Sequence, residues 1–281
     1  MFSIIVPTFN SGKTISRTLS SILTQSYDKF EVLVVDNHSS DNTKLIVDSF
    51  ADNRVTFHLV ENQGMPAISR NHGVSLAKFD YIAFCDSDDT WMNNKLLTCM
   101  GYIEKGSDFI AHDLELSGSL LKAFFKIIFS RRRPKTFNEF IILGNPIMQS
   151  SVVVRREILL RVGIYNTDPK FIAIEDCHLW AKILRSGIEL SYIQKKLGTY
   201  FYSPLALSSS ADQFRANRSF RLEFSPKYKP SWYKYNIATY LLRKKMYRRS
   251  SMYFASLCLD PKCSTELRLK SLFLLVKICA R

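Results

Sequence analysis

The N-terminal third of the chain alternates between short unbroken apolar runs and stretches in which apolar residues recur every three or four positions. Each unbroken run ends in a polar cluster, which is typical of a parallel strand buried on both faces. The predicted strands are Phe2–Val6, Phe30–Val35, Val55–Val60 and Tyr81–Cys85. The stretches between them predict helices, one of them over about Pro66–Ala77. This alternation predicts an α/β fold with a mainly parallel sheet flanked by helices.

The pattern becomes less regular farther along the chain. Apolar periodicity predicts further helices over about Asn93–Glu104, Glu175–Arg185, Trp232–Ser256 and Thr265–Cys279, and short strands over Asp108–Asp113 and Ser151–Val154. The composition becomes polar beyond about Ser203. We therefore expect one domain over residues 1–210 and a basic, aromatic-rich helical appendage over residues 211–281.

Charge is distributed unevenly along the chain. The 281 residues carry 39 basic and 25 acidic side chains, a formal net charge of +14. Residues 215–281 hold 16 of the basic side chains and only 3 of the acidic ones, so nearly all of the excess lies in the C-terminal quarter. A basic region of this kind indicates an anionic partner, either nucleic acid or an anionic membrane surface.

Composition excludes several classes of protein. With 46% hydrophobic and 23% charged residues, the chain is neither disordered nor collagen-like. No apolar run in the sequence approaches the roughly 18–20 residues that span a bilayer, and no basic leader precedes the first strand. The six cysteines are scattered without zinc-ligand spacing, which favours reduced thiols. We expect a protein that is made and kept in the cytoplasm.

The strongest candidate for chemistry is the acidic cluster Asp86-Ser87-Asp88-Asp89, which directly follows a predicted buried strand. Carboxylates this close together repel one another unless a cation compensates them, and hard divalent cations prefer carboxylate oxygens. In an extended turn, Asp86 and Asp88 point toward one ligand. The alternative is that the cluster only begins the following helix, where acidic residues are favourable.

Polar residues also follow the other predicted strands. Asp36 ends the second strand, where its carboxylate can accept hydrogen bonds from a base or a ribose, or can serve only to shape the turn. Arg70 lies on a helix that begins near the same edge of the sheet, and arginine suits phosphate contact, although many helix arginines are simply solvated. The adjacent acids Glu175 and Asp176 open a later helix. They either favour its N-terminus or provide a general base.

Taken together and in order, these clusters resemble the signatures of the family 2 glycosyltransferases, which have the GT-A fold. The segments that carry the resemblance are Pro7–Asn10, Val35–Asp41, Ala67–Gly73, Asp86–Trp91 and Glu175–Trp180. The resemblance covers about residues 1–210. It implies an inverting transferase that uses a nucleotide-sugar donor, most commonly a UDP-sugar.

The resemblance also implies roles for individual residues of the donor site. The donor nucleotide would be bound by Thr8, Asn10, Asp36, Arg70 and Asp86. Within this set, Thr8 and Asp36 would contact the uracil, Arg70 the base or the phosphates, and Asp86 the ribose or the sugar. Asp88 would ligate a Mg²⁺ or Mn²⁺ ion on the diphosphate.

On the acceptor side, the resemblance implies that Asp176 is the catalytic base, with Glu175 and Trp180 shaping the site. Trp91 is expected to pack below the acidic loop. One departure concerns a segment in which many relatives carry Tyr-Arg-x-His, because Leu205 stands at about the His position. Leucine binds neither metal nor phosphate, which leaves open how the donor site closes.

The C-terminal region interleaves aromatic and basic side chains, a composition that suits an anionic membrane interface. We therefore expect a peripheral enzyme on the inner face of the cytoplasmic membrane, whose acceptor is a lipid-linked saccharide in bacterial surface polysaccharide synthesis. No nucleic-acid partner is expected, because residues 1–214 are nearly charge-balanced and carry the acidic clusters.

Four alternatives remain open from the sequence. They are another nucleotide-sugar or nucleotidyl transfer enzyme, a basic nucleic-acid-binding protein, a catalytically degenerate scaffold, and a C-terminal region that is only a solvated helical face.

Overall fold

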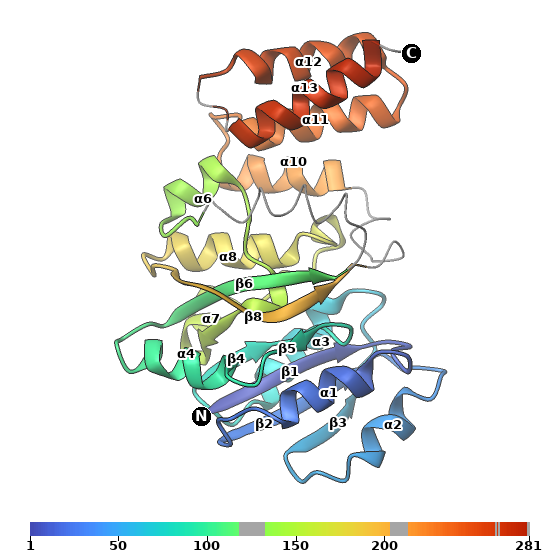
Figure 1. Ribbon diagram of the computed structural model, residues 1–281, viewed down its shortest axis with the longest axis vertical. Helices are drawn as coiled ribbons and strands as arrows, with labels where there is room; N and C mark the ends of the chain where they lie inside the picture. Colours follow the sequence, from blue (N-terminus) through green and yellow to red (C-terminus); the bar gives the residue numbers. More distant parts are fainter. Residues whose placement is uncertain (118–132, 203–212, 262, 264, 280–281) are drawn as a thin grey trace.

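A single mixed sheet organises the protein, as the computed structural model shows for residues 1–117, 133–202, 213–261, 263 and 265–279. Its strand order is β3-β2-β1-β4-β7-β6-β8-β5 (Figure 1). The strands are β1 (Phe2–Thr8), β2 (Phe30–Asp36), β3 (Val55–Leu59), β4 (Tyr81–Phe84), β5 (Thr90–Trp91), β6 (Phe109–Ser117), β7 (Val153–Arg155) and β8 (Ser191–Phe201). The expected α/β class and the four N-terminal strands are confirmed.

The N-terminal strands are parallel and in a register that brings their carboxyl ends together. β1 lies between β2 and β4, and Thr8 at the end of β1 is paired with Asp36 at the end of β2. β7 pairs antiparallel with β4 and β6, whereas β6 and β8 are parallel. The polar clusters predicted from the sequence therefore meet at one edge of the sheet, where ligands bind in sheets of this kind.

Alternate residues of the central strands supply two hydrophobic cores, one on each face. Ile4 and Val6 of β1 face one core, and Ile5 faces the other. The first core is covered by α1 (Ile15–Leu23), α2 (Thr43–Ser49) and α4 (Lys95–Ile103). The second is covered by α3 (Pro66–Leu76), α6 (Phe137–Leu143), α7 (Arg156–Val162) and α8 (Glu175–Arg185). Short 3₁₀ turns, η1 (Gln149–Ser151) and η2 (Pro169–Phe171), complete this part.

The C-terminal helices form a layer beyond the second face. α10 (Gln213–Phe224) contributes Phe220 and Phe224 to the core of that face. Farther out, α11 (Ser231–Arg243), α12 (Tyr247–Leu259) and α13 (Thr265–Cys279) pack together around a small core of their own (Figure 1). Among the described residues, none of the helices combines the length and the apolar character that crossing a bilayer requires.

One expectation about the elements needs correction, and one strand was not predicted. The stretch predicted as one helix over Trp232–Ser256 is two helices, α11 and α12, because Lys245 takes a left-handed φ of 58° and the chain turns back on itself. The long strand β8 was not expected, since register shifts in its pairing with β6 break the period-two pattern. The expected boundary between residues 210 and 211 lies outside the described residues, so the division into two domains stays a prediction.

α3 approaches β1 so closely that only glycine fits at one of its positions. A Cβ atom built on Gly73 would lie 2.6 Å from Cγ2 of Ile5, which is fully buried. Gly101 in α4 has no neighbouring atom within 4 Å of the same position. The two helical glycines therefore differ in the space around them.

We expect Gly73→Ala to lower the free energy of unfolding by about 1–3 kcal/mol, because the overpacked methyl group displaces Ile5. Gly101→Ala, the matched control, should raise it by about 0.5–1 kcal/mol through helix propensity alone. Urea unfolding of both variants measures the difference. An increase in stability for both would show that α3 is free to move away from β1.

Candidate active site

A large cleft opens at the carboxyl edge of the sheet. Its volume is about 1180 Å³, and it is lined by the loops that follow β1, β2, β3 and β4, by η1, by the start of α8 and by the end of β8. Pockets for small molecules measure roughly 300–1,000 Å³. The cleft therefore has room for a nucleotide together with part of a second substrate.

Side-chain hydrogen bonds tie the first three loops to one another. The backbone N–H of Asn10 donates to Oγ of Ser39 at 2.7 Å, and Oδ1 of Asn10 accepts from the backbone N–H of Ser40 at 2.9 Å. Oδ1 of Asn37 accepts from the backbone N–H of Asn62 at 2.8 Å. These bonds fix the cleft wall that the sequence assigned to the nucleotide.

The two residues predicted to bind uracil, Thr8 and Asp36, both lie at this wall, but they differ in their hydrogen bonding. Thr8 lines the cleft, and its buried Oγ1 has no hydrogen-bond partner among the described residues. Asp36 is 1% exposed, and its two oxygens accept from the backbone N–H and the hydroxyl of Ser39. Thr8 is thus available to a ligand, whereas Asp36 shapes the turn. Contact between Asp36 and a base stays a prediction.

The acidic turn after β4 holds three carboxylates that differ in burial. Asp86, Asp88 and Asp89 all line the cleft, but Asp89 is fully buried and accepts from Oγ of Ser150 at 2.5 Å and from the backbone N–H of Phe201 at 3.0 Å. Ser150 also accepts from the backbone N–H of Asp86 at 3.0 Å. The turn is therefore held from below while Asp86 and Asp88 remain in the cleft.

Asp86 and Asp88 fit a divalent cation only with help from a ligand. The described residues contain no group of three or more His, Cys, Asp or Glu side chains that could hold a metal ion. Burial, and next the nearby Asp86, raise the pKa of Asp88 to about 6. Mg²⁺ is commonly held by one or two carboxylates together with substrate phosphates, and this pair matches that arrangement.

Arg70 joins this turn to the start of α8. Its Nη2 donates to Oδ1 of Asp86 at 2.8 Å, and its Nη1 donates to Oε1 of Glu175 at 2.8 Å. The side chain is 7% exposed. Burial alone would lower the pKa of Arg70, but Asp86 and Glu175 outweigh it and raise the pKa above its ordinary value. Both arms of the guanidinium are thus engaged, and contact of Arg70 with a donor, or of Glu175 with an acceptor, stays a prediction.

Asp176 is the second acid of α8 and lines the cleft. Burial, and next the adjacent Glu175, raise the pKa of Asp176 to about 7. A carboxylate with this pKa is suited to accept a proton near neutral pH. Asp176 thus lies in the cleft with a pKa suited to a proton acceptor, and its role as the catalytic base stays a prediction.

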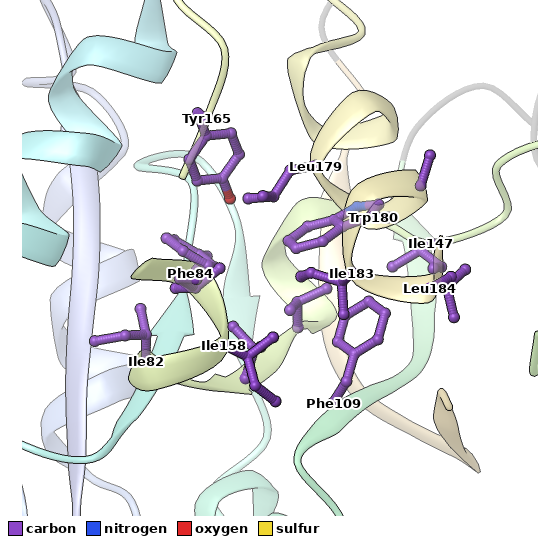
Figure 2. Close-up of a cluster of buried hydrophobic side chains, with 14 of the residues drawn as sticks. Ile82, Phe84, Phe109, Ile147, Ile158, Tyr165, Leu179, Trp180, Ile183 and Leu184 are labelled. Atoms are coloured by element: carbon purple, nitrogen blue, oxygen red, sulfur yellow. The ribbon is translucent and has the colours of Figure 1, made fainter. Parts of the chain in front are cut away.

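Trp180 does not lie on the acceptor side, and this expectation is wrong. Its side chain is fully buried in the core, with its ring 5.4 Å from that of Phe109 and 6.2 Å from that of Tyr165 (Figure 2). Trp180 follows Asp176 by one helical turn, and this turn places it beneath the cleft. Trp91, in contrast, packs below the acidic loop as expected and donates from Nε1 to the backbone oxygen of Ser150.

Several residues of the cleft were not found from the sequence. Arg17 in α1, Ser150 in η1 and Tyr202 just beyond β8 all line it. Arg17 had a signal, because it is a cation in the first helix after the nucleotide loop. Ser150 and Tyr202 reach the cleft through segments whose fold was not predicted. Leu205 lies outside the described residues.

Comparisons with known proteins agree with this architecture. Residues 3–159 match the family model described as Glycosyl transferase family 2. The chain is 37% identical to the putative teichuronic acid biosynthesis glycosyltransferase TuaG of Bacillus subtilis over 218 residues, 75% of this chain and 82% of that protein. It is 32% identical over 217 residues to UDP-Glc:alpha-D-GlcNAc-diphosphoundecaprenol beta-1,3-glucosyltransferase WfgD of Escherichia coli, 75% of this chain and 80% of that protein.

Solved structures share the fold. S. aureus TarS 1–349 in complex with UDP-GlcNAc superposes with a TM-score of 0.65 at 23% identity, covering 85% of this chain and 71% of that one. The mannosyltransferase PcManGT of Pyrobaculum calidifontis, in complex with GDP-Man and Mn²⁺, has a TM-score of 0.58 at 20% identity, covering 99% and 73%. The fold is thus GT-A-like, the fold of a glycosyltransferase. The chain belongs to glycosyl transferase family 2.

Proposed function

We propose that this glycosyltransferase transfers a sugar, with inversion, from a UDP-sugar to a hydroxyl of a lipid-linked saccharide in bacterial surface polysaccharide synthesis. The ion-pair bridge from Asp86 through Arg70 to Glu175 carries the proposal, because it joins the acidic turn after β4 to the start of α8, where Asp176 would act as the general base. The names of the relatives support the substrates: WfgD uses UDP-Glc and a diphosphoundecaprenol-linked GlcNAc, and TuaG belongs to teichuronic acid biosynthesis.

The reaction is a single displacement. The acceptor oxygen forms a bond to C1 of the donor sugar as the bond from C1 to the β-phosphate oxygen breaks, and the electron pair of that bond leaves with UDP. The proton of the acceptor hydroxyl passes to the carboxylate of Asp176. Because attack and departure take place on opposite faces of C1, the configuration inverts, and no covalent enzyme intermediate forms.

The donor would lie against the loops after β1, β2 and β4. Thr8, with its unpartnered hydroxyl, and Asn10 and Asp36 would bind the nucleoside, and Asp86 the ribose or the sugar. Asp88, with Asp86 beside it, would hold a Mg²⁺ or Mn²⁺ ion through the diphosphate. When bound, the ion offsets the negative charge that develops on the leaving phosphate oxygen.

We expect UDP with Mn²⁺ to raise the melting temperature by about 5–10 °C at a UDP concentration about 100 times its Kd. Asp88→Asn should abolish the Mn²⁺-dependent part of the shift and leave the effect of UDP alone unchanged. Asp48→Asn, which alters an exposed carboxylate on α2, is the control. Stabilisation by GDP in place of UDP would overturn the donor assignment.

Asp176→Asn should lower kcat by about 10²–10⁴-fold without changing the affinity for UDP, because the amide cannot accept the hydroxyl proton. In the wild type, kcat/KM should fall as the pH drops below about 7, where Asp176 is protonated, and reach a plateau above it. Asp168→Asn, at an exposed position before α8, should retain both the rate and the pH profile. Wild-type turnover by Asp176→Asn would show that the base lies elsewhere or that the reaction is of another kind.

The C-terminal helices offer a surface for an anionic membrane. On α13, Leu267 faces the small core together with Leu274 and Ile278. The opposite side of the helix exposes an apolar stripe at helical spacing, made of Leu269, Leu272, Phe273 and Val276. This stripe lies in the region that holds 16 basic and 3 acidic side chains. An exposed apolar stripe among cations matches an interfacial helix at anionic lipid, where a lipid-linked acceptor resides.

Vesicles containing phosphatidylglycerol should therefore co-sediment the protein, and binding should weaken with salt as the Debye length falls from about 30 Å at 0.01 M to about 3 Å at 1 M. Replacement of Leu269, Leu272 and Val276 by Gln should reduce binding, whereas Leu45→Gln on α2, also exposed, should not. Equal binding to neutral and anionic vesicles would contradict an electrostatic interface.

A further inference from the structure

The cleft holds two arginines among the described residues that line it, and their charges are used differently. Arg70 is paired with Asp86 and Glu175. Arg17, an exposed residue of α1, takes part in none of the ion pairs of the described residues, although it also lines the cleft. Its charge is therefore available to a ligand.

Two contacts hold the guanidinium of Arg17 in place. One Nη2 hydrogen is donated to the backbone oxygen of Asp88 at 2.8 Å, and the guanidinium carbon lies 3.8 Å from the ring centroid of Phe201. A guanidinium has five N–H donors, so most of them remain free for acceptors in the cleft. A planar cation fixed on one face and open at its edge is the arrangement that binds phosphate oxygens well, often through two parallel hydrogen bonds.

The charge of the cleft points to the same ligand. Five carboxylates line it together with the two arginines: Asp86, Asp88, Asp89, Glu175 and Asp176. Since Arg70 is already shared between two of them, a diphosphate would enter a region with little free positive charge. Arg17 is adjacent to the Asp88 turn, where the proposed function puts that diphosphate, and it adds a cation there.

We propose that Arg17 binds the phosphate oxygens of a diphosphate ligand in the cleft, first of all the diphosphate of the donor. The assignment rests on the proposed function for the identity of the donor. A diphosphate also occurs in the proposed lipid-linked acceptor, so the experiment separates the two sources.

The experiment compares Arg17→Gln and Arg17→Lys with the wild-type chain. Affinities for UDP, UMP, uridine and inorganic pyrophosphate are measured by calorimetry with Mn²⁺ present. Lys13→Gln is the matched control, because Lys13 is an exposed cation just before the same helix and does not line the cleft. Arg17→Gln should weaken UDP and pyrophosphate binding by about 10- to 100-fold, in line with the loss of a charge-assisted hydrogen bond.

The pattern across the ligands distinguishes binding from a structural role. UMP should lose less affinity than UDP, uridine should lose none, and Arg17→Lys should retain part of the affinity for UDP. An equal loss for all four ligands would mean that Arg17 only supports the Asp88 turn, and no loss for any of them would mean that it faces no donor phosphate. Either result overturns the assignment to the donor.

Turnover assays separate the acceptor as the source. If Arg17→Gln spares UDP but raises KM for a lipid diphosphate saccharide, and not for a saccharide without phosphate, the bound diphosphate is that of the acceptor. If KM for both acceptors is also unchanged, the proposal fails. A wild-type chain that binds pyrophosphate but not UDP would contradict the proposed donor, and the response of pyrophosphate to Arg17→Gln would still decide the role of this residue.

Discussion

One buried arginine links the two halves of the cleft. Arg70 bonds to Asp86 and to Glu175, which stands 105 positions away from it in the sequence. A buried guanidinium is tolerated only when carboxylates compensate it, and removal of one partner of such a pair costs about 3–5 kcal/mol. The acidic turn after β4 and the first turn of α8 are therefore constrained to meet. The position of Asp176 follows from that constraint, since it is the next residue after Glu175.

The two cores of the sheet fix the positions of the strand ends from which the loops of this bridge start. Alternate residues of the short parallel strands are buried on opposite faces, so a one-residue shift in register would move each side chain into the other core and disturb the packing of both. The strand ends are thereby fixed, and the loops that leave them start from defined points. The buried carboxylate of Asp89 fixes the loop after β4 in the same way, because it anchors the acidic turn to Ser150 and to the end of β8.

The parts of the fold that the sequence predicted are those with local signals. Parallel strands buried on both faces appear as unbroken apolar runs, and the polar residues after them belong to one edge, so Thr8, Asp86, Asp88 and Asp176 were placed in the cleft from pattern and resemblance together. Side-chain direction is not encoded in this way. Trp180 lies one turn beyond Asp176 on the same side of α8. One turn farther along the helix, however, this side faces the core and not the cleft. Arg70 was expected to contact a ligand because arginine suits phosphate and because of the resemblance, and that contact stays a prediction. Its two ion pairs could not be predicted, since Asp86 and Glu175 come from distant segments that no local pattern connects with it.

Backbone strain collects at the same edge. Asn10, Gln63 and Ala173 have left-handed φ values of 48°, 52° and 68°, a region that costs residues other than glycine roughly 1–3 kcal/mol each. Hydrogen bonds between the loops after β1 and β2 offset this cost on one side of the cleft, where Asn10 bonds to Ser39 and Ser40. On the other side Ala173 directly precedes Ile174 and the paired acid Glu175, so the ion pair with Arg70 opposes relaxation of that turn. The loops therefore hold a shape that they would not adopt in isolation. The free-energy cost of ordering them is met when the protein folds, before any substrate binds.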